Sequence, residues 1–226
     1  MIDSSDFLVL SPHTTEGLSR CFEKLRELGA TSGDYLEFGV FQGHSLLHAY
    51  REAERLGLGE MRFFGFDSFA GLPEPDGADD APMHTLTGVD RLEAGMFVSS
   101  REEVLARLAA HGADLSRIRL VEGYFHDTLN PATRERLGLR EAAIVLVDCD
   151  LYDSTRRVLD FVRELLRDRS ILVFDDWNIF GADPARGERR AFAEFLERNP
   201  GGLRPETFVP LGWHGQSFIL RDARTG

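Results

Sequence analysis

Two short apolar runs dominate the pattern of hydrophobic and polar positions along the chain, and each ends abruptly in acidic residues. The runs occupy residues 142–147 and 170–174. The acids that follow them are Asp148, Asp150, Asp175 and Asp176. Strands that are apolar along their whole length, without alternation, are typical of parallel sheets buried on both faces. We therefore predict that both runs are interior strands.

The segment between the two runs has the spacing of an amphipathic helix. Its apolar residues recur three and four positions apart, and they are Val158, Phe161, Val162, Leu165 and Leu166. Asp153 or Ser154 is placed to cap the first turn. A helical crossover makes the two strands parallel, so their carboxyl ends, with all four acids, meet at one edge of the sheet. Ligands of open parallel sheets bind beyond this edge.

The rest of the chain alternates between helical and strand-like patterns. Helical spacing is found in residues 14–28, 44–56, 104–108, 127–139 and 188–198, and further strands are expected from residue 34, over 61–67 and over 118–121. Residues 207–211 and 216–220 read as an antiparallel hairpin at the sheet edge. This order predicts one α/β domain over residues 1–226, with helices on both faces of a mostly parallel sheet.

Two segments are expected to cover the sheet or its carboxyl edge. Residues 1–30 are interpreted as an N-terminal helical segment that packs beside the sheet or over the site. Residues 68–100 show little periodicity and many Pro, Gly and Asp residues. In a compact domain such a stretch predicts either a functional lid or a disordered insert, and we favour the lid.

A strand followed by a glycine turn and a helix suggests a nucleotide-type site. Glu37, Gly39 and Gly43 lie in this turn, in the context that nucleotide binding requires. The spacing alone is a weak signal, since glycines also serve tight turns and close helix packing. Asp67 ends the next strand, where such folds hold ribose hydroxyls. The alternative for Asp67 is that it only begins the following loop.

Composition and charge narrow the class of partner. The 226 residues carry a formal net charge of −12, which argues against nucleic acid and anionic membranes because both need a basic surface. Cys21 and Cys149 form no disulfide or zinc pattern. No apolar run approaches the roughly 20 residues that span a bilayer, and the N-terminus lacks a secretory signal. A small-molecule partner and a cytoplasmic location are the expectations that remain.

The acids at the predicted strand ends suggest a metal. Three carboxylates without Cys or His ligands suit magnesium, calcium or manganese better than zinc. Some of the acids could instead cap helices or face solvent, Asp176 first among them. Asp148 and Asp150 lie two positions apart, so in an extended segment their side chains would project to the same side, about 7 Å apart along the chain.

Five segments together resemble the macrocin-type O-methyltransferases, which methylate sugar hydroxyls of macrolide and aminocoumarin natural products. In chain order they read EFGVFQGHS, FGFDSFAGLPEP, EGYFHDTL, VDCDLYDST and FDDW, and the resemblance covers residues 14–220. It implies the class I methyltransferase fold, a Rossmann-like seven-stranded sheet, with S-adenosylmethionine and magnesium as cofactors. It is also consistent with a homo-oligomer.

The resemblance assigns roles to individual residues. It makes Asp148, Asp175 and Asp176 the metal ligands and Asp150 the general base. The cofactor site that we expect from it consists of Glu37, Gly39, Gly43, Ser45, Asp67, Ser68, Glu122, Gly123 and Asp148. The acceptor is expected to be a sugar hydroxyl, and neither its identity nor the position methylated is indicated.

Three alternatives compete with a methyltransferase. The DxD motif and the later acid pair superficially match a haloacid-dehalogenase-type phosphatase, but Tyr152 stands where that motif needs Thr or Val. A nicotinamide-dependent oxidoreductase could use the glycine turn, but GxGxxG and a hydride-transfer set are absent. The third alternative is a cofactor-binding module without turnover. His44 and His214 could touch a ligand, but we expect both to be surface or capping residues.

Overall fold

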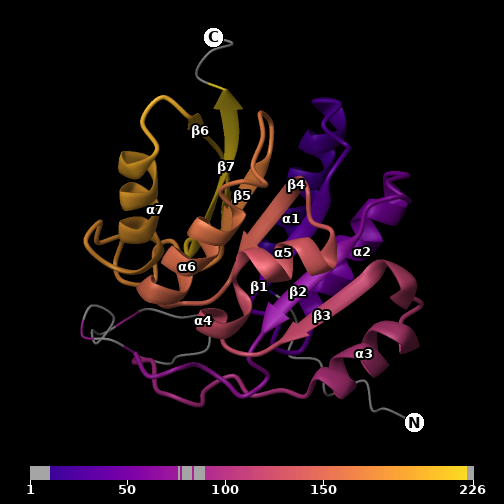
Figure 1. Cartoon of the computed structure of the whole chain (residues 1–226), viewed down its shortest axis with the longest axis horizontal. Coiled ribbons are helices and arrows are strands. Elements are labelled where there is room, and N and C mark those ends of the chain that lie inside the picture. Colours follow the sequence, from indigo (N-terminus) through magenta and orange to yellow (C-terminus); the bar gives the residue numbers. More distant parts are fainter. Residues whose placement is uncertain (1–10, 76, 78–82, 84–89, 223–226) are drawn as a thin grey trace.

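A single seven-stranded sheet organises the computed structural model, which describes residues 11–75, 77, 83 and 90–222. The strand order is β3-β2-β1-β4-β5-β7-β6 (Figure 1). Strands β1 to β5 pair in parallel, whereas β7 is antiparallel to both β5 and β6. The strands are β1 Asp34–Phe38, β2 Phe63–Asp67, β3 Ile118–Glu122, β4 Ala142–Val147, β5 Ile171–Phe174, β6 Leu203–Leu211 and β7 Gly215–Asp222. The predicted mostly parallel sheet with a C-terminal hairpin is confirmed.

Helices cover both faces of the sheet. They are α1 Pro12–Glu27, α2 His44–Arg55, α3 Arg101–Ala110, α4 Phe125–Thr128, α5 Pro131–Leu137, α6 Tyr152–Val162 and α7 Gly187–Arg198, with a short 3-10 turn at Leu115–Arg117. One buried apolar cluster joins α1, α2 and α3 to one sheet face. The other joins residues of α6 and α7 to the opposite face. Every residue of β4 and β5 is buried, as the unbroken apolar runs predicted.

The register of the strands aligns the candidate residues at one edge. Val147 of β4 pairs with Phe174 of β5, so the acids that follow them leave the sheet side by side. Val147 also pairs with Phe38 of β1, which places the glycine turn next to the end of β4. Asp67 pairs with Glu122 across β2 and β3. The predicted convergence at the carboxyl edge is therefore a direct result of strand register.

The start of α6 differs from the prediction. The helix is preceded by Leu151 at its N-cap, and no side chain caps it. Asp153 instead pairs with Arg156 and Arg157 on the same helix. The reason is that the chain turns sharply between β4 and α6, where the amide of Leu151 donates to the carbonyl of Cys149. The expected cap at Asp153 or Ser154 is wrong.

Both ends of the segment at 68–100 are anchored near the carboxyl edge. The amide of Leu72 donates to the carbonyl of Met96, and the amide of Gly95 donates to the carbonyl of Leu72. Met83 and Leu92 are buried in a small apolar cluster with Leu151, Ile179 and Phe180. Residues 76, 78–82 and 84–89 of the expected lid, and residues 1–10 of the expected N-terminal segment, lie outside the described residues. Whether this segment acts as a lid stays a prediction.

No helix within the described ranges combines the length and apolar composition of a membrane-spanning segment.

Candidate active site

A cavity of about 970 Å³ opens at the carboxyl edge of the sheet. The loops after β1, β2, β3, β4 and β5 all contribute to its wall, together with the first turn of α1 and the turn between β6 and β7. Representative lining residues are Thr14, Gly39, Asp67, Tyr124, Asp148, Asp175 and His214. The glycine turn and the acidic strand ends thus face one common space.

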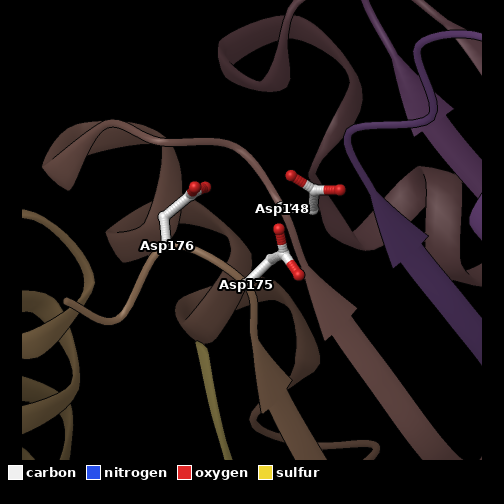
Figure 2. Close-up of side chains that lie close together, drawn as sticks. All are labelled: Asp148, Asp175 and Asp176. Atoms are coloured by element: carbon white, nitrogen blue, oxygen red, sulfur yellow. The ribbon is translucent and has the colours of Figure 1, made fainter. Parts of the chain in front are cut away.

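Three carboxylates cluster in the wall of this cavity. Asp148, Asp175 and Asp176 each offer one oxygen, and these oxygens lie within 4.8 Å of one another. Figure 2 shows the three side chains extending from neighbouring strand ends toward each other. Burial raises the pKa of all three, and the charge of the neighbouring acids raises those of Asp148 and Asp176 further. An oxygen-only donor set with this repulsion fits a hard divalent cation such as magnesium.

Asp150 lines the cavity but does not have the expected backbone conformation. Its φ is 58°, in the left-handed region, which Asp tolerates better than most residues. Strand β4 has already ended at Val147, so the expected projection of Asp148 and Asp150 from one extended segment is wrong. In the observed turn, the amide of Asp150 donates to Oδ2 of Asp176 at 2.9 Å. The backbone of Asp150 therefore orients the last acid of the cluster.

His214 occupies the cavity wall, although we expected it at the surface. It is only 3% exposed, and its Nδ1 lies 2.8 Å from the carbonyl oxygen of Asp175. The hairpin β6–β7 lies beside β5, so its turn returns to the carboxyl edge. Sequence reasoning missed this contact because the position of a hairpin turn depends on register with a strand far away in the chain.

The other half of the cavity contains part of the predicted cofactor site. Gly39, Asp67 and Ser68 line it. The carboxylate of Asp67 accepts hydrogen bonds from the amides of Val40 and Phe41 at 2.7 and 2.8 Å. It also accepts a hydrogen bond from the amide of Phe69 at 2.7 Å. Asp67 thereby fixes the loops after β1 and β2 against each other.

The remaining predicted cofactor residues are absent from the lining of the cavity. They are Glu37, Gly43, Ser45, Glu122 and Gly123. Glu37 is fully buried and accepts hydrogen bonds from Tyr35 Oη at 2.6 Å and Ser45 Oγ at 2.8 Å. Burial raises the pKa of Glu37 to about 8. Glu37 therefore ties β1 to the first turn of α2 through its hydrogen bond from Ser45.

Aromatic residues complete the wall near Asp67, and the sequence patterns did not reveal them. Phe41 and Phe97 line the cavity and meet edge to face, with ring centroids 5.8 Å apart. Both have a positive φ, 46° and 63°. Ser99 Oγ donates to the carbonyl of Phe41 and ties the returning loop to the glycine turn. The contact joins residues 56 positions apart through irregular loops, where no periodicity exists to detect.

Comparison with known proteins identifies the family. The family model described as macrocin O-methyltransferase (TylF) matches residues 13–199. The chain belongs to the macrocin O-methyltransferase family. The resemblance drawn from the five sequence segments is thus confirmed, and the phosphatase and nicotinamide alternatives are superseded.

Two curated relatives of this macrocin-family member are O-methyltransferases by name, and the name of the first includes a rhamnosyl group. The chain is 31% identical over 175 residues to the 8-demethyl-8-(2,3-dimethoxy-alpha-L-rhamnosyl)-tetracenomycin-C 4'-O-methyltransferase of Streptomyces olivaceus, an alignment that covers 74% of the chain and 63% of the relative. It is 28% identical over 194 residues to the mycinamicin III 3''-O-methyltransferase of Micromonospora griseorubida, covering 83% of the chain and 71% of the relative.

Solved structures confirm the class I O-methyltransferase fold. The O-methyltransferase NovP superimposes with a TM-score of 0.74 at 20% identity, over 92% of the chain and 80% of NovP. The calicheamicin methyltransferase CalS11 superimposes with a TM-score of 0.70 at 25% identity, over 93% of the chain and 80% of CalS11.

The buried Glu37 leads to a testable pH dependence. Its pKa is raised from 4.5 to about 8, so the folded protein holds a proton here that the unfolded chain has lost. This contribution to the free energy of unfolding is present in full below pH 4.5. It is lost progressively as the pH rises from there through the folded-state pKa of about 8. Glu37→Gln stays neutral, so its Tm relative to wild type, measured without cofactor and in chelator, should rise between pH 5 and 9. A Tm difference independent of pH would contradict the raised pKa.

Proposed function

We propose that this macrocin-family protein transfers a methyl group from S-adenosylmethionine to a hydroxyl of a sugar or sugar-containing small molecule. The observation that carries the proposal is one cavity that joins a nucleotide-type glycine turn to a cluster of three carboxylates. The names of the two curated relatives, which specify rhamnosyl and mycinamicin hydroxyl positions, support a sugar hydroxyl as the acceptor.

In this proposal the glycine turn and Asp67 hold the cofactor. Asp67 already accepts three amide hydrogen bonds, and a carboxylate with about four lone-pair sites can still accept a ribose hydroxyl. Phe41 and Phe97 supply apolar wall beside it. Such a wall excludes water from the bound cofactor.

The carboxylates Asp148, Asp175 and Asp176 would hold magnesium next to the acceptor. When bound, the ion supplies positive charge that orients and acidifies a sugar hydroxyl. Methyl transfer is an in-line displacement, so the oxygen must face the methyl carbon as its proton leaves. Asp150 lines the same cavity and is the proposed acceptor of that proton. Good orientation of two reactants can contribute up to about 7–11 kcal/mol.

The charge of the cavity favours an uncharged acceptor. One arginine, Arg157, is found among the described lining residues, and its Nε is 2.7 Å from Asp153 Oδ2. The acidic lining residues are Asp67, Glu74, Asp148, Asp150, Asp153, Asp175 and Asp176. One divalent ion and the sulfonium of the cofactor offset only part of this charge. A phosphorylated acceptor would therefore be repelled more than a neutral glycoside.

Gly39 links the two halves of the proposed site, and its replacement is a sharp test. Its φ is 91°, and a Cβ at this position would overlap the carbonyl oxygen of Asp148. Gly57 has a similar φ of 73° but nothing within 4 Å of an added Cβ. Gly57→Ala should cost roughly the 1–2 kcal/mol of left-handed strain. Gly39→Ala should lower the free energy of unfolding, measured in urea, by more than this. Calorimetry should also show weaker binding of S-adenosylhomocysteine. Equal effects of the two substitutions would contradict the close approach.

The experiment that tests the function combines binding with turnover. Calorimetry should show S-adenosylhomocysteine binding, and a panel of neutral glycosides with magnesium should reveal methyl transfer by mass spectrometry. A glycoside lacking the methylated hydroxyl should bind without reacting. Cofactor binding with no turnover across the panel would favour a non-catalytic module. A homo-oligomer and a cytoplasmic location stay predictions.

A further inference from the structure

The first turn of α1 contacts the carboxylate cluster directly. Thr14 Oγ1 donates a hydrogen bond to Asp175 Oδ1 at 3.1 Å, across 161 positions of sequence. Thr14 is 2% exposed and lines the cavity. A hydroxyl buried against a carboxylate in this way costs free energy unless the hydrogen bond is made, so the contact fixes both partners.

Tertiary contacts hold Thr14 in this position. The side chain of Ser11 caps α1 by accepting from the amide of His13, and Pro12 occupies the first turn. The ring of His13 lies against Gly212 in the β6–β7 turn, where a Cβ would come within 2.8 Å of it. The start of α1 is thus packed between the strand ends and the hairpin turn. Any movement of this turn would disturb the Thr14–Asp175 hydrogen bond or the packing of His13 on Gly212.

Val147 and His214 also contact Asp175. Its amide donates to the carbonyl of Val147, and its own carbonyl oxygen is 2.8 Å from His214 Nδ1. The same Nδ1 lies 3.6 Å from Asp175 Oδ2. Main chain and side chain of Asp175 are therefore both fixed, and Thr14 donates a hydrogen bond to its carboxylate.

We propose that Thr14 is a positioning residue of the metal site, which sets the orientation of the Asp175 carboxylate and so makes the first turn of α1 part of that site. The inference rests on the proposed metal-dependent function. Residues that hydrogen-bond to a metal ligand fix its orientation, and replacing them typically lowers metal affinity about 10- to 100-fold. Metal binding and the order of the α1 first turn are then coupled, and each stabilises the other.

The test uses three variants and manganese as a spectroscopic probe. Thr14→Val removes the hydroxyl and keeps the shape, whereas Thr14→Ser keeps the hydroxyl. Thr15→Val makes the same change one position along, where the hydroxyl donates to the carbonyl of Ser11 and not to the cluster. Manganese affinity, measured by the loss of the free-ion electron paramagnetic resonance signal, should fall about 10- to 100-fold in Thr14→Val. It should stay within about threefold of wild type in Thr14→Ser and Thr15→Val, since both keep the Asp175 contact.

Hydrogen exchange supplies a second readout that does not depend on activity. Manganese should slow amide exchange in the first turns of α1 in wild type and Thr14→Ser, and it should have little effect there in Thr14→Val. S-adenosylhomocysteine affinity should be unchanged in all three variants, because Thr14 contacts the acid half of the cavity.

Three outcomes would overturn the inference, and the last of them would also overturn the proposed function. If wild type binds manganese and Thr14→Val binds it equally well, Thr14 does not position Asp175 although the proposed function survives. The same conclusion follows if Thr15→Val loses as much affinity as Thr14→Val, since the effect would then be one of helix stability. If wild type itself binds no manganese, the proposed metal-dependent function fails together with this inference.

Discussion

Asp148→Asn is expected to lower methyl transfer by at least about 10²-fold, the scale on which misplaced reacting groups lose rate. Asp148 lies at the end of the central strand, with an oxygen within 4.8 Å of oxygens from both Asp175 and Asp176. An amide keeps the shape of the side chain but removes the negative charge that binds a cation. Manganese affinity should fall sharply. Chelator added to wild type should give the same loss of activity, reversed by magnesium.

The same variant should be more stable than wild type when no metal is present. Burial and the neighbouring acids raise the pKa of Asp148 well above its ordinary value of 3.8, so the folded protein binds more protons than the unfolded chain. The contribution of Asp148 to the stability of wild type in chelator is therefore present in full below pH 3.8. It is lost progressively as the pH rises from there through the raised pKa. Asp148→Asn should have the higher Tm at pH 8, and the advantage should shrink toward pH 4.

A matched acid on the surface controls for the change of charge. Asp160 on α6 pairs with Arg198 and has 46% of its side chain exposed. Asp160→Asn should leave metal affinity and turnover at the wild-type level. Full activity of Asp148→Asn, or of wild type after confirmed metal removal, would rule out the metal-dependent mechanism.

Asp150→Asn is expected to lower turnover by about 10²- to 10⁴-fold, the usual contribution of a positioned general base. Asn tolerates the left-handed backbone found here, so the turn should persist. The hydrogen bond to Asp176 Oδ2 comes from the main-chain amide and is independent of the side chain. Metal and cofactor affinities should therefore stay near wild type. Single-turnover assays with saturating magnesium separate the chemical step from binding.

Asp150→Gly serves as the control for backbone effects, since glycine adopts a positive φ without strain. It should lose turnover as Asp150→Asn does, while retaining metal affinity. Should Asp150→Asn abolish metal binding but keep residual turnover at saturating magnesium, Asp150 would be a ligand. The general base would then be sought at another cavity residue, with His214 tested next.

The sequence was sufficient to place the four acids at one edge because that conclusion needs only local patterns. Unbroken apolar runs predict buried parallel strands, and an amphipathic helix between them makes their ends coincide. The pairing of Val147 with Phe174 is the structural form of this argument. The prediction for the glycine turn and Asp67 came instead from the place where nucleotide-binding folds hold a ribose.

The missed features depend on contacts between distant segments or on irregular backbone. The left-handed turn at Asp150 cannot be read from a pattern that assumes an extended chain. The Thr14–Asp175 hydrogen bond and the position of His214 require the packing of α1 and of the β6–β7 turn on the sheet edge. Phe97 reaches Phe41 only because its loop returns to the edge. Local sequence patterns carry no information about contacts between such distant segments or about irregular backbone.

The arrangement of the cavity wall indicates how the enzyme could be engineered to methylate other acceptors. The glycine turn and the three carboxylates follow directly from strands of the sheet, whereas Leu72 and Ile179 lie in the loops after β2 and β5. Loops and termini accept sequence change more readily than buried strands do. Mutant libraries aimed at new glycosides should therefore vary the loop segments around Leu72 and Ile179, with Thr14, Gly39 and Asp148 kept constant. In natural divergence, the same division would let acceptor choice drift while the chemistry stays intact.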